Sequence, residues 1–393
     1  MDTEKLKASV IADVDERRQQ LSELSLKIHS HPELAFKESQ AAAWLSQFLQ
    51  DNGFSVERGI CGLPTAFRGS YGRGEPVIAI LAEYDALPGL GHACGHNIIA
   101  VSAVAAGVAA RRAVDSLGGR VLVIGTPGEE LYGGKVIMGE QGAFDGVDAA
   151  MIAHPGEMSA AAIQALACQT LDVEFFGRAS HAAASPEAGI NALDAMLLSF
   201  AAISALRQHI RSTARIHGII TDGGQAANIV PAHSTGNFIV RAREDDYLEE
   251  LKERVLNCFA GAATASGARL EYRWGGLRYA SMVNNMTMAR LFRQNMRELG
   301  RSMHLSDESG SFGSTDMGNV SHLVPSIHPM VAIVPPKSAS IHSPQFAQAA
   351  ASEEGTRGLV DAAKALAMTA VDLLSSTELL GRVEDEFRHK KDK

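Results

Sequence analysis

The chain has 393 residues, which suits two domains better than one or three, and its 46% hydrophobic and 21% charged residues are typical of a folded, soluble protein. A formal net charge of −9 argues against a nucleic-acid-binding surface, and four widely spaced cysteines argue against a disulfide framework. We see neither a signal-peptide pattern nor an apolar run long enough to span a membrane, so we expect a cytoplasmic protein without membrane or nucleic-acid partners.

Short apolar runs alternate with helical stretches between residues 75 and 155. The runs at 76–81, 120–125 and 148–153 have the length and composition of buried strands, and a fourth follows at 330–334. A buried helix is expected at 98–112. This alternation predicts an α/β domain with a mixed, mostly parallel sheet.

The middle of the chain has a different order of elements. It predicts strands at 168–176, 214–221, 235–241 and 268–274, and helices at 189–211 and 246–266. The order β-α-β-β-α-β is the ferredoxin-like α+β arrangement. We therefore expect residues 167–279 to form a small domain inserted into a larger one built from residues 1–166 and 280–393.

Polar residues follow the predicted strands of the larger domain. Cys94 and His96 lie in the turn after the first strand, Glu129 and Glu130 follow the second, and His154 follows the third. Open α/β sheets gather ligands at the carboxyl ends of their strands. Thiolate, imidazole and carboxylate groups together suit Zn²⁺, with manganese, cobalt or nickel tolerated, so the order predicts a metal site.

The adjacent pair Glu129-Glu130 is the more informative feature of this cluster. One carboxylate can bind a metal while its neighbour takes a proton from water and delivers it to a leaving amine. Each residue also has an ordinary interpretation: a buried small cysteine, a solvated helix start, a loop histidine. Their common position at successive strand ends favours the metal site.

Longer motifs carry a family resemblance. They are A-E-Y-D-A-L-P-G-L-G-H-A-C-G-H-N at 82–97, G-R-A-S-H-A-A-A-S-P at 177–186, N-A-L-D at 191–194 and G-S-T-D-M-G-N-V-S at 313–321. With them the chain resembles, from about His31 to Ala370, the metallopeptidase and amidohydrolase family of aminoacylases, carboxypeptidase G and indole-acetyl-amino-acid hydrolases. The first motif is most similar to the branch of β-alanyl-lysine dipeptidases and p-aminobenzoyl-glutamate hydrolase subunits.

The resemblance implies a zinc-peptidase catalytic domain with two divalent metal ions per subunit. The implied ligands are Cys94, His96, Glu130, His154 and His342, with Cys94 as a candidate bridge between the metals. Glu129 would then act as general base and general acid. Spacing alone does not distinguish His342 from the other histidines.

The inserted domain resembles the family's lid and dimerisation domain, which implies a homodimer. His181 matches a histidine that polarises the scissile carbonyl, while Asn228 and Arg241 match residues that bind the substrate carboxylate. Without the resemblance, a surface salt bridge is the better interpretation of Arg241. The segment 313–316 fits either a substrate-cleft loop or a structural turn.

Two positions depart from wider family patterns. Glu83 stands where other branches have a histidine ligand, which favours the Cys94/His96 ligand set. Asn97 stands where many relatives have Asp, and this difference bears on metal affinity if that Asp acts behind a ligand.

We therefore expect a metal-dependent hydrolase that cleaves the amide bond of an N-acyl amino acid or small dipeptide with a free C-terminal carboxylate. The sequence does not separate an aminoacylase from a dipeptidase or carboxypeptidase. The alternative is an inactive homologue that serves as a binding or scaffold protein. A serine hydrolase is disfavoured because the chain lacks a G-x-S-x-G motif.

Overall fold

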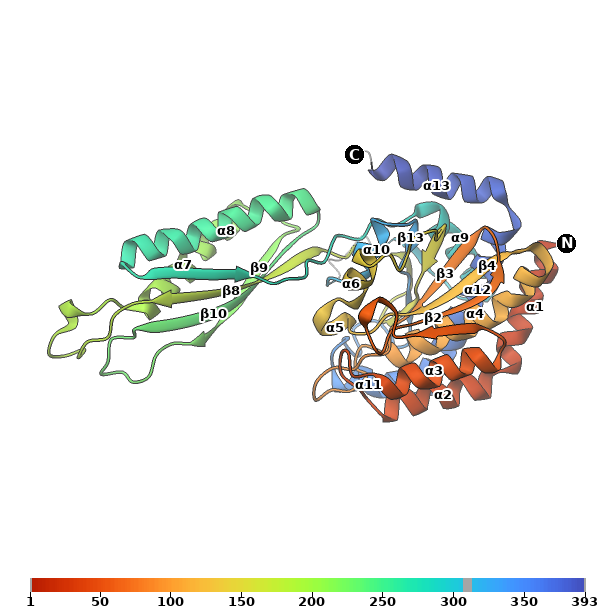
Figure 1. The fold of residues 1–393 in the computed structure, drawn as a ribbon, viewed down its shortest axis with the longest axis horizontal. Helices are drawn as coiled ribbons and strands as arrows, with labels where there is room; N and C mark the ends of the chain where they lie inside the picture. Colours follow the sequence, from red (N-terminus) through yellow and green to blue (C-terminus); the bar gives the residue numbers. More distant parts are fainter. Residues whose placement is uncertain (1, 307–312, 392–393) are drawn as a thin grey trace. The chain divides into compact units, whose positions relative to one another are not determined.

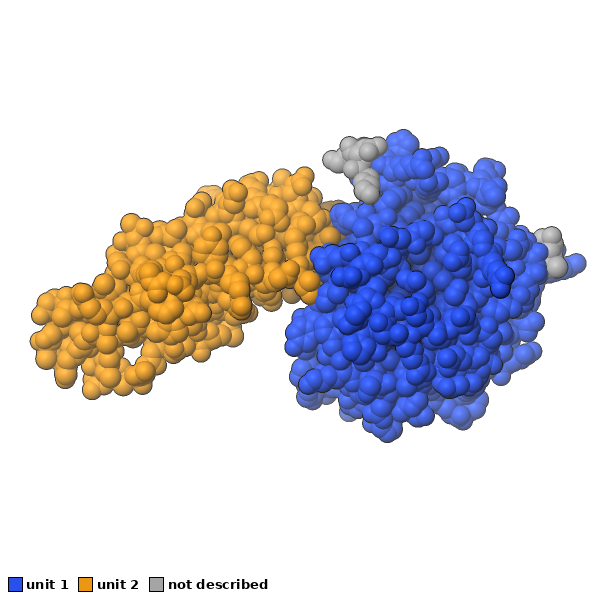
Figure 2. Space-filling view, viewed as in Figure 1, with its two compact units in different colours: residues 1–163, 282–310, 315–393 blue, residues 164–281, 311–314 orange. Residues whose placement is uncertain are grey.

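The computed structural model describes residues 2–306 and 313–391 and divides the chain into two compact units (Figures 1 and 2). Unit 1 comprises residues 1–163, 282–310 and 315–393, and unit 2 comprises residues 164–281 and 311–314. The chain enters and leaves unit 2 near residues 163 and 281, compared with the expected 166 and 280. Each unit has its own hydrophobic core.

The main sheet of unit 1 has six strands in the order β1-β2-β4-β3-β5-β13. Their bounds are β1 Ser55–Arg58, β2 Phe67–Arg73, β3 Val77–Ala82, β4 Gly119–Gly125, β5 Ala149–Met151 and β13 Ser326–Ile327. Strands β4, β3, β5 and β13 run parallel to one another, whereas β2 pairs antiparallel with both β4 and the edge strand β1. All six residues of β3 are buried, as expected for a parallel strand covered on both faces.

A second sheet of unit 1 has the order β12-β7-β14-β6. Its strands are β6 His154–Gly156, β7 Ala160–Ala162, β12 His304–Ser306 and β14 Met330–Ala332. The predicted strand 330–334 thus lies in this smaller sheet and pairs in parallel with β6, which begins at His154. Unit 1 therefore has the mixed, mostly parallel architecture that the sequence predicts.

Helices cover the sheets of unit 1 (Figure 1). They are α1 Thr3–Glu16, α2 Arg18–Ser30, α3 Ser39–Asp51, α4 His96–Leu117, α5 Glu129–Tyr132, α6 Gly134–Glu140, α9 Met286–Glu298, α10 Met317–Ser321, α11 Pro344–Ala350, α12 Glu353–Ser375 and α13 Thr377–Lys391. Helix α4 packs on β3, β4 and α12, and Gly107 permits the close approach because a Cβ there would lie 2.2 Å from Val123. By length and apolarity α4 could also cross a membrane, but 89% of its apolar window is buried, as in a core helix.

Unit 2 has the predicted β-α-β-β-α-β order. Its elements are β8 Ala167–Phe176, α7 Ala192–Leu206, β9 Arg215–Asp222, β10 His233–Ala242, α8 Asp245–Ser266 and β11 Arg269–Trp274. The sheet is antiparallel with the order β11-β8-β10-β9. Strand β10 alternates strictly between buried and half-buried residues, so its even-numbered residues face the helices and its odd-numbered residues lie on the open face.

Candidate metal centre and active site

The strand ends of unit 1 bring polar residues together. Glu83 and Asp85 follow β3, the one-turn helix α5 with Glu129 and Glu130 follows β4, and His154 begins β6. Cys94 precedes α4 in a tight turn in which Gly95 has φ 77°. A Cβ at Gly95 would lie 2.5 Å from Pro155, so glycine is required where this turn meets β6.

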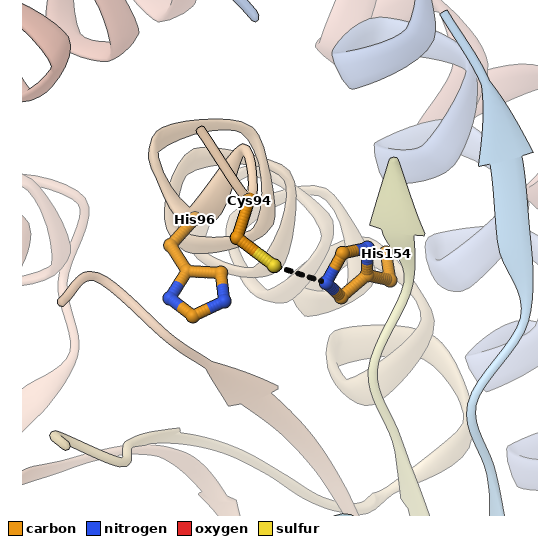
Figure 3. Close-up of side chains that lie close together, drawn as sticks. All are labelled: Cys94, His96 and His154. Atoms are coloured by element: carbon orange, nitrogen blue, oxygen red, sulfur yellow. Dashed lines mark hydrogen bonds between the residues drawn. The ribbon is translucent and has the colours of Figure 1, made fainter. Parts of the chain in front are cut away.

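The five predicted metal ligands meet in two overlapping groups. Cys94, His96 and His154 form one, and Cys94, Glu130 and His342 form the other; the ligand atoms of each group lie within 4.8 Å of one another. The Cys94 Sγ lies 3.3 Å from His154 Nε2 (Figure 3), and His342 Nε2 lies 3.3 Å from Glu130 Oε1. Because both groups share Cys94, the arrangement fits two divalent ions, one held by each group, with Cys94 available to both.

Neighbouring oxygens orient the two buried imidazoles. His96 Nδ1 lies 3.0 Å from Asp85 Oδ1, and within the described chain its Nε2 has no hydrogen-bond partner. His154 Nδ1 donates to the Pro155 carbonyl at 2.6 Å, which leaves Nε2 directed toward Cys94. In both residues the second nitrogen thus points toward the other candidate ligands, and Asp85 is placed like a carboxylate that orients a histidine ligand.

Burial controls the protonation of these ligands. Burial, followed by the nearby His96, lowers the pKa of His154 to about 4, so the ring is the neutral ligand form at neutral pH. Burial raises the pKa of the Cys94 thiol well above its usual value. A divalent ion would favour the thiolate, and the donor set of sulfur, nitrogen and oxygen therefore fits the two ions that the sequence implies.

Glu129 lies next to the ligands and is 9% exposed. Burial raises the pKa of its carboxyl well above the usual value, and the charges of Glu83 and Asp316 raise it further. A carboxyl group that holds a proton readily is suited to accept one from water and pass it on.

Several residues of the centre were not predicted as site residues. They are Asp85, Lys135 and His328, together with Glu83, which the sequence marked only as a departure, and Asp316, which it marked only as part of the segment 313–316. The His328 ring is buried 5.6 Å from that of His154, and neither of its nitrogens has a hydrogen-bond partner among the described residues. Burial lowers the pKa of His328 to about 3, so the ring is neutral.

Asn97 lies outside the metal centre. Its side-chain amide is buried and donates to Ser25 Oγ at 2.9 Å and to the Ala350 carbonyl at 3.1 Å. Asn97 thus connects α4 to α2 and to the end of α11.

The candidate substrate-binding residues lie in unit 2. His181 is exposed, and its Nδ1 accepts hydrogen bonds from the backbone of Ala183 and Ala184, so Nε2 carries the proton and is available as a donor. Asn228 is also exposed, and its carbonyl accepts from the Ala182 N–H at 3.0 Å, next to the bridge between His181 and Ile229. These contacts hold His181 and Asn228 on paired loops.

Arg241 lies on the open face of β10. Its Nη1 donates to Ser314 Oγ at 3.0 Å, and no ion pair of Arg241 is found in the described part of the chain. Among the residues that the structure describes, the guanidinium thus has no salt bridge of the kind that the ordinary interpretation of a strand arginine would give it. The segment 313–316 supplies Ser314 to unit 2 and Asp316 to the buried cluster of unit 1.

Comparison with known proteins defines the class of this protein. The model of "Peptidase family M20/M25/M40" matches residues 79–365. The chain therefore belongs to the M20 peptidase family and is a peptidase or amidohydrolase.

Individual relatives are consistent with this class. The Xaa-Arg dipeptidase of Mus musculus is 39% identical and the match covers 98% of this chain and 93% of that protein. A p-aminobenzoyl-glutamate hydrolase subunit of Escherichia coli is 34% identical, with 75% of this chain and 66% of that protein covered. A Bacillus subtilis structure described as a dinuclear metal-binding peptidase of the M20 family has the same fold, with a TM-score of 0.72, 21% identity and coverage of 92% and 99%.

Proposed function

We propose that this peptidase is a metal-dependent dipeptidase that cleaves dipeptides with a free C-terminal carboxylate, and that dipeptides ending in arginine or lysine are its preferred substrates. The observation that carries the proposal is the convergence of Cys94, His96, Glu130, His154 and His342 on two overlapping donor groups beside Glu129. The choice of arginine rests on the similarity to Xaa-Arg dipeptidase over nearly the whole chain, and the choice of lysine on the resemblance of residues 82–97 to the β-alanyl-lysine dipeptidases.

The proposed ligands for the two ions are Cys94 with His96 and His154, and Cys94 with Glu130 and His342. When bound, divalent ions polarise a carbonyl group and lower the pKa of water toward neutrality. Zn²⁺ suits the thiolate and imidazole donors best, and Mn²⁺, Co²⁺ or Ni²⁺ are acceptable replacements. The reducing conditions of the cytoplasm, the proposed location, would keep Cys94 available as a thiol, and among the described residues none of the four cysteines forms a disulfide.

The remaining roles belong to side chains of the protein. Glu129 takes a proton from the attacking water and delivers it to the leaving amine, a task that suits its raised pKa. The exposed Nε2–H of His181 donates to the carbonyl oxygen as negative charge develops there. Arg241 and Asn228 bind the substrate carboxylate, for which a guanidinium offers two parallel donors.

A homodimer formed through unit 2 is part of the proposal. Strand β9 is an edge strand with Ile219 64% exposed, and the outer face of α7 exposes Leu197 and Leu198 at 50% and 45%. An apolar edge strand is normally covered by another chain or protected by charge. Ile219→Lys together with Leu198→Lys should convert a dimer to monomers in light scattering; a wild-type monomer would contradict this assembly.

Hydrolysis of an aryl-acyl glutamate is the second candidate. It is favoured by the 34% identity to the p-aminobenzoyl-glutamate hydrolase subunit. Both activities cleave an amide next to a free carboxylate, so one substrate panel separates them.

The test combines metal analysis with that panel. Purified protein is analysed for bound metal, stripped with a chelator, reconstituted with Zn²⁺, Mn²⁺ or Co²⁺, and assayed with Xaa-Arg, Xaa-Lys and Xaa-Glu dipeptides, p-aminobenzoyl-glutamate and N-acetyl amino acids. We expect about two metals per chain and metal-restored cleavage of the basic dipeptides. Metal binding without hydrolysis of any substrate would favour the inactive homologue.

A further inference from the structure

A buried cluster of charged side chains around Lys135 lies next to the proposed metal ligands. The Lys135 side chain is fully buried at the start of α6, and its Nζ lies 2.5 Å from Glu83 Oε1 and 2.7 Å from Asp316 Oδ1. The Lys135 backbone N–H also donates to Asp316 Oδ2 at 2.9 Å. Burying an ammonium is costly unless it is paired, and here both partners are buried carboxylates.

Glu129 is the third carboxylate of this cluster. Oxygens of Glu83, Glu129 and Asp316 lie within 4.8 Å of one another. Three carboxylates at this spacing in a buried site repel one another strongly unless a cation offsets them. The ammonium of Lys135 supplies this positive charge, because it contacts two of the three and acts electrostatically on all of them.

The two oxygens of Glu83 have different neighbours. Oε1 contacts Lys135, whereas Oε2 lies 3.7 Å from His96 Nε2. Glu130 Oε1, a proposed metal ligand, lies at the similar distance of 3.8 Å from the same nitrogen. By type and position Glu83 could therefore compete as a further ligand, and its contact with Lys135 is what distinguishes it from Glu130.

We propose that Lys135 is a positioning residue that holds Glu83 and Asp316 beside Glu129 and keeps Glu83 out of the metal ligand set. Its effect on catalysis rests on the proposed hydrolytic function, whereas its effect on metal binding does not. A lysine that only stabilises the packing of α6 would give a different result, because its loss would weaken the fold and the metal site together.

The first test is Glu83→Gln, which leaves Lys135 paired with Asp316. Zn²⁺ affinity is measured by competition with a chromophoric chelator, with Glu130→Gln as the matched control for loss of a carboxylate ligand. We expect Glu83→Gln to bind Zn²⁺ within a few-fold of the wild type while Glu130→Gln binds far more weakly. An equal loss in the two variants would make Glu83 a ligand and overturn the proposal.

The second test is Lys135→Met, a neutral side chain of similar length. Loss of the positive charge frees Glu83, so we expect Zn²⁺ binding to become tighter by about tenfold or more. Because the repulsion that Glu83 and Asp316 exert on Glu129 is no longer offset, kcat should fall by about 10²-fold while KM changes little. Unchanged or weaker Zn²⁺ binding would overturn the proposal.

The double variant Lys135→Met/Glu83→Gln separates charge from packing. It removes the competing carboxylate together with its counter-ion, so the cluster keeps the net charge of the wild type. We expect Zn²⁺ affinity to return to the wild-type value and kcat to recover in part; failure of both to recover would assign Lys135 a packing role only. If the wild type cleaves none of the peptides, the proposed function fails, yet the Zn²⁺ measurements still decide the metal-binding part of this inference.

Discussion

The candidate residues of unit 1 are buried and held by other side chains, whereas those of unit 2 are largely accessible to solvent. Cys94, His96 and His154 are exposed by 7%, 0% and 8%, while His181 and Asn228 lie on exposed loops. Among the proposed ligands, the His342 side chain is the exception, with 52% exposed.

This difference has a physical consequence. In a buried site the charge and orientation of every group depend on its neighbours, because water does not screen them. Residues on exposed loops interact with a ligand more independently of one another. Substitutions in unit 1 should therefore change metal content and kcat, and substitutions of the carboxylate-binding residues of unit 2, Asn228 and Arg241, should change mainly KM.

The largest effect is expected for Cys94→Ala. Cys94 belongs to both donor groups, so its loss should lower the binding of both ions and abolish hydrolysis. His154→Ala removes a residue of one group only and should leave one ion bound. Metal analysis of the dialysed proteins checks this, with Cys258→Ala on α8 as the control; two ions retained by Cys94→Ala would contradict the shared ligand.

The second-largest effect on activity is expected for Glu129→Gln, because this substitution removes proton transfer while keeping the shape of the side chain. We expect kcat to fall by about 10²- to 10⁴-fold with both metals retained. Metal analysis and steady-state kinetics with a basic dipeptide measure the two quantities. Turnover close to that of the wild type would exclude Glu129 as the base.

Arg241→Ala tests whether unit 2 binds the substrate carboxylate. Loss of a charge-assisted hydrogen bond to the substrate carboxylate should raise KM by about 10- to 100-fold with kcat little changed. A dipeptide amide, which lacks that carboxylate, should be cleaved equally by the variant and the wild type. Arg215→Ala, at the cross-strand position on β9, is the matched control, and an equal effect of both substitutions would argue against a specific role.

Much of this arrangement could be predicted from the sequence because its signals are local. Long segments such as β10 and α8 can be recognised from the periodic spacing of apolar residues within the segment itself. The residues at strand ends, from Cys94 to His154, follow apolar runs that are easily recognised. His342 has no such context: it lies in a loop with φ 67°, and only the family resemblance selects it.

The unpredicted residues share a different property, since their role depends on contacts between distant segments. Lys135 gives no signal in the sequence because lysines are usually exposed, and its burial depends on the pairing with Glu83 and Asp316. His328 follows β13, a strand of two residues that is too short to leave a pattern. Asp85 was the most accessible to prediction, because it stands two residues after Glu83 at the end of β3.

The smallest effect on activity is expected at Glu38, a buried carboxyl of unit 1 that has no cationic partner among the described residues. Its Oε2 accepts from Thr65 Oγ1 at 3.0 Å, and within the described chain Oε1 has no hydrogen-bond partner. Burial raises its pKa from 4.5 to about 7. The folded state therefore binds this proton more tightly than the unfolded state, so its contribution to stability is complete below pH 4.5 and is lost as the pH rises to about 7.

Glu38→Gln removes this titration and should leave the kinetics unchanged. At pH 8 the variant should be more stable than the wild type, with an upper limit of about 3 kcal/mol, and the difference should shrink toward pH 5. Thermal unfolding of the metal-free proteins between pH 5 and pH 8 measures it, with Glu57→Gln at an exposed position of β1 as the control. A stability difference that does not change with pH would mean that Glu38 is ionised at no cost, and that buried carboxylates of unit 1 need no cation such as Lys135 to offset them.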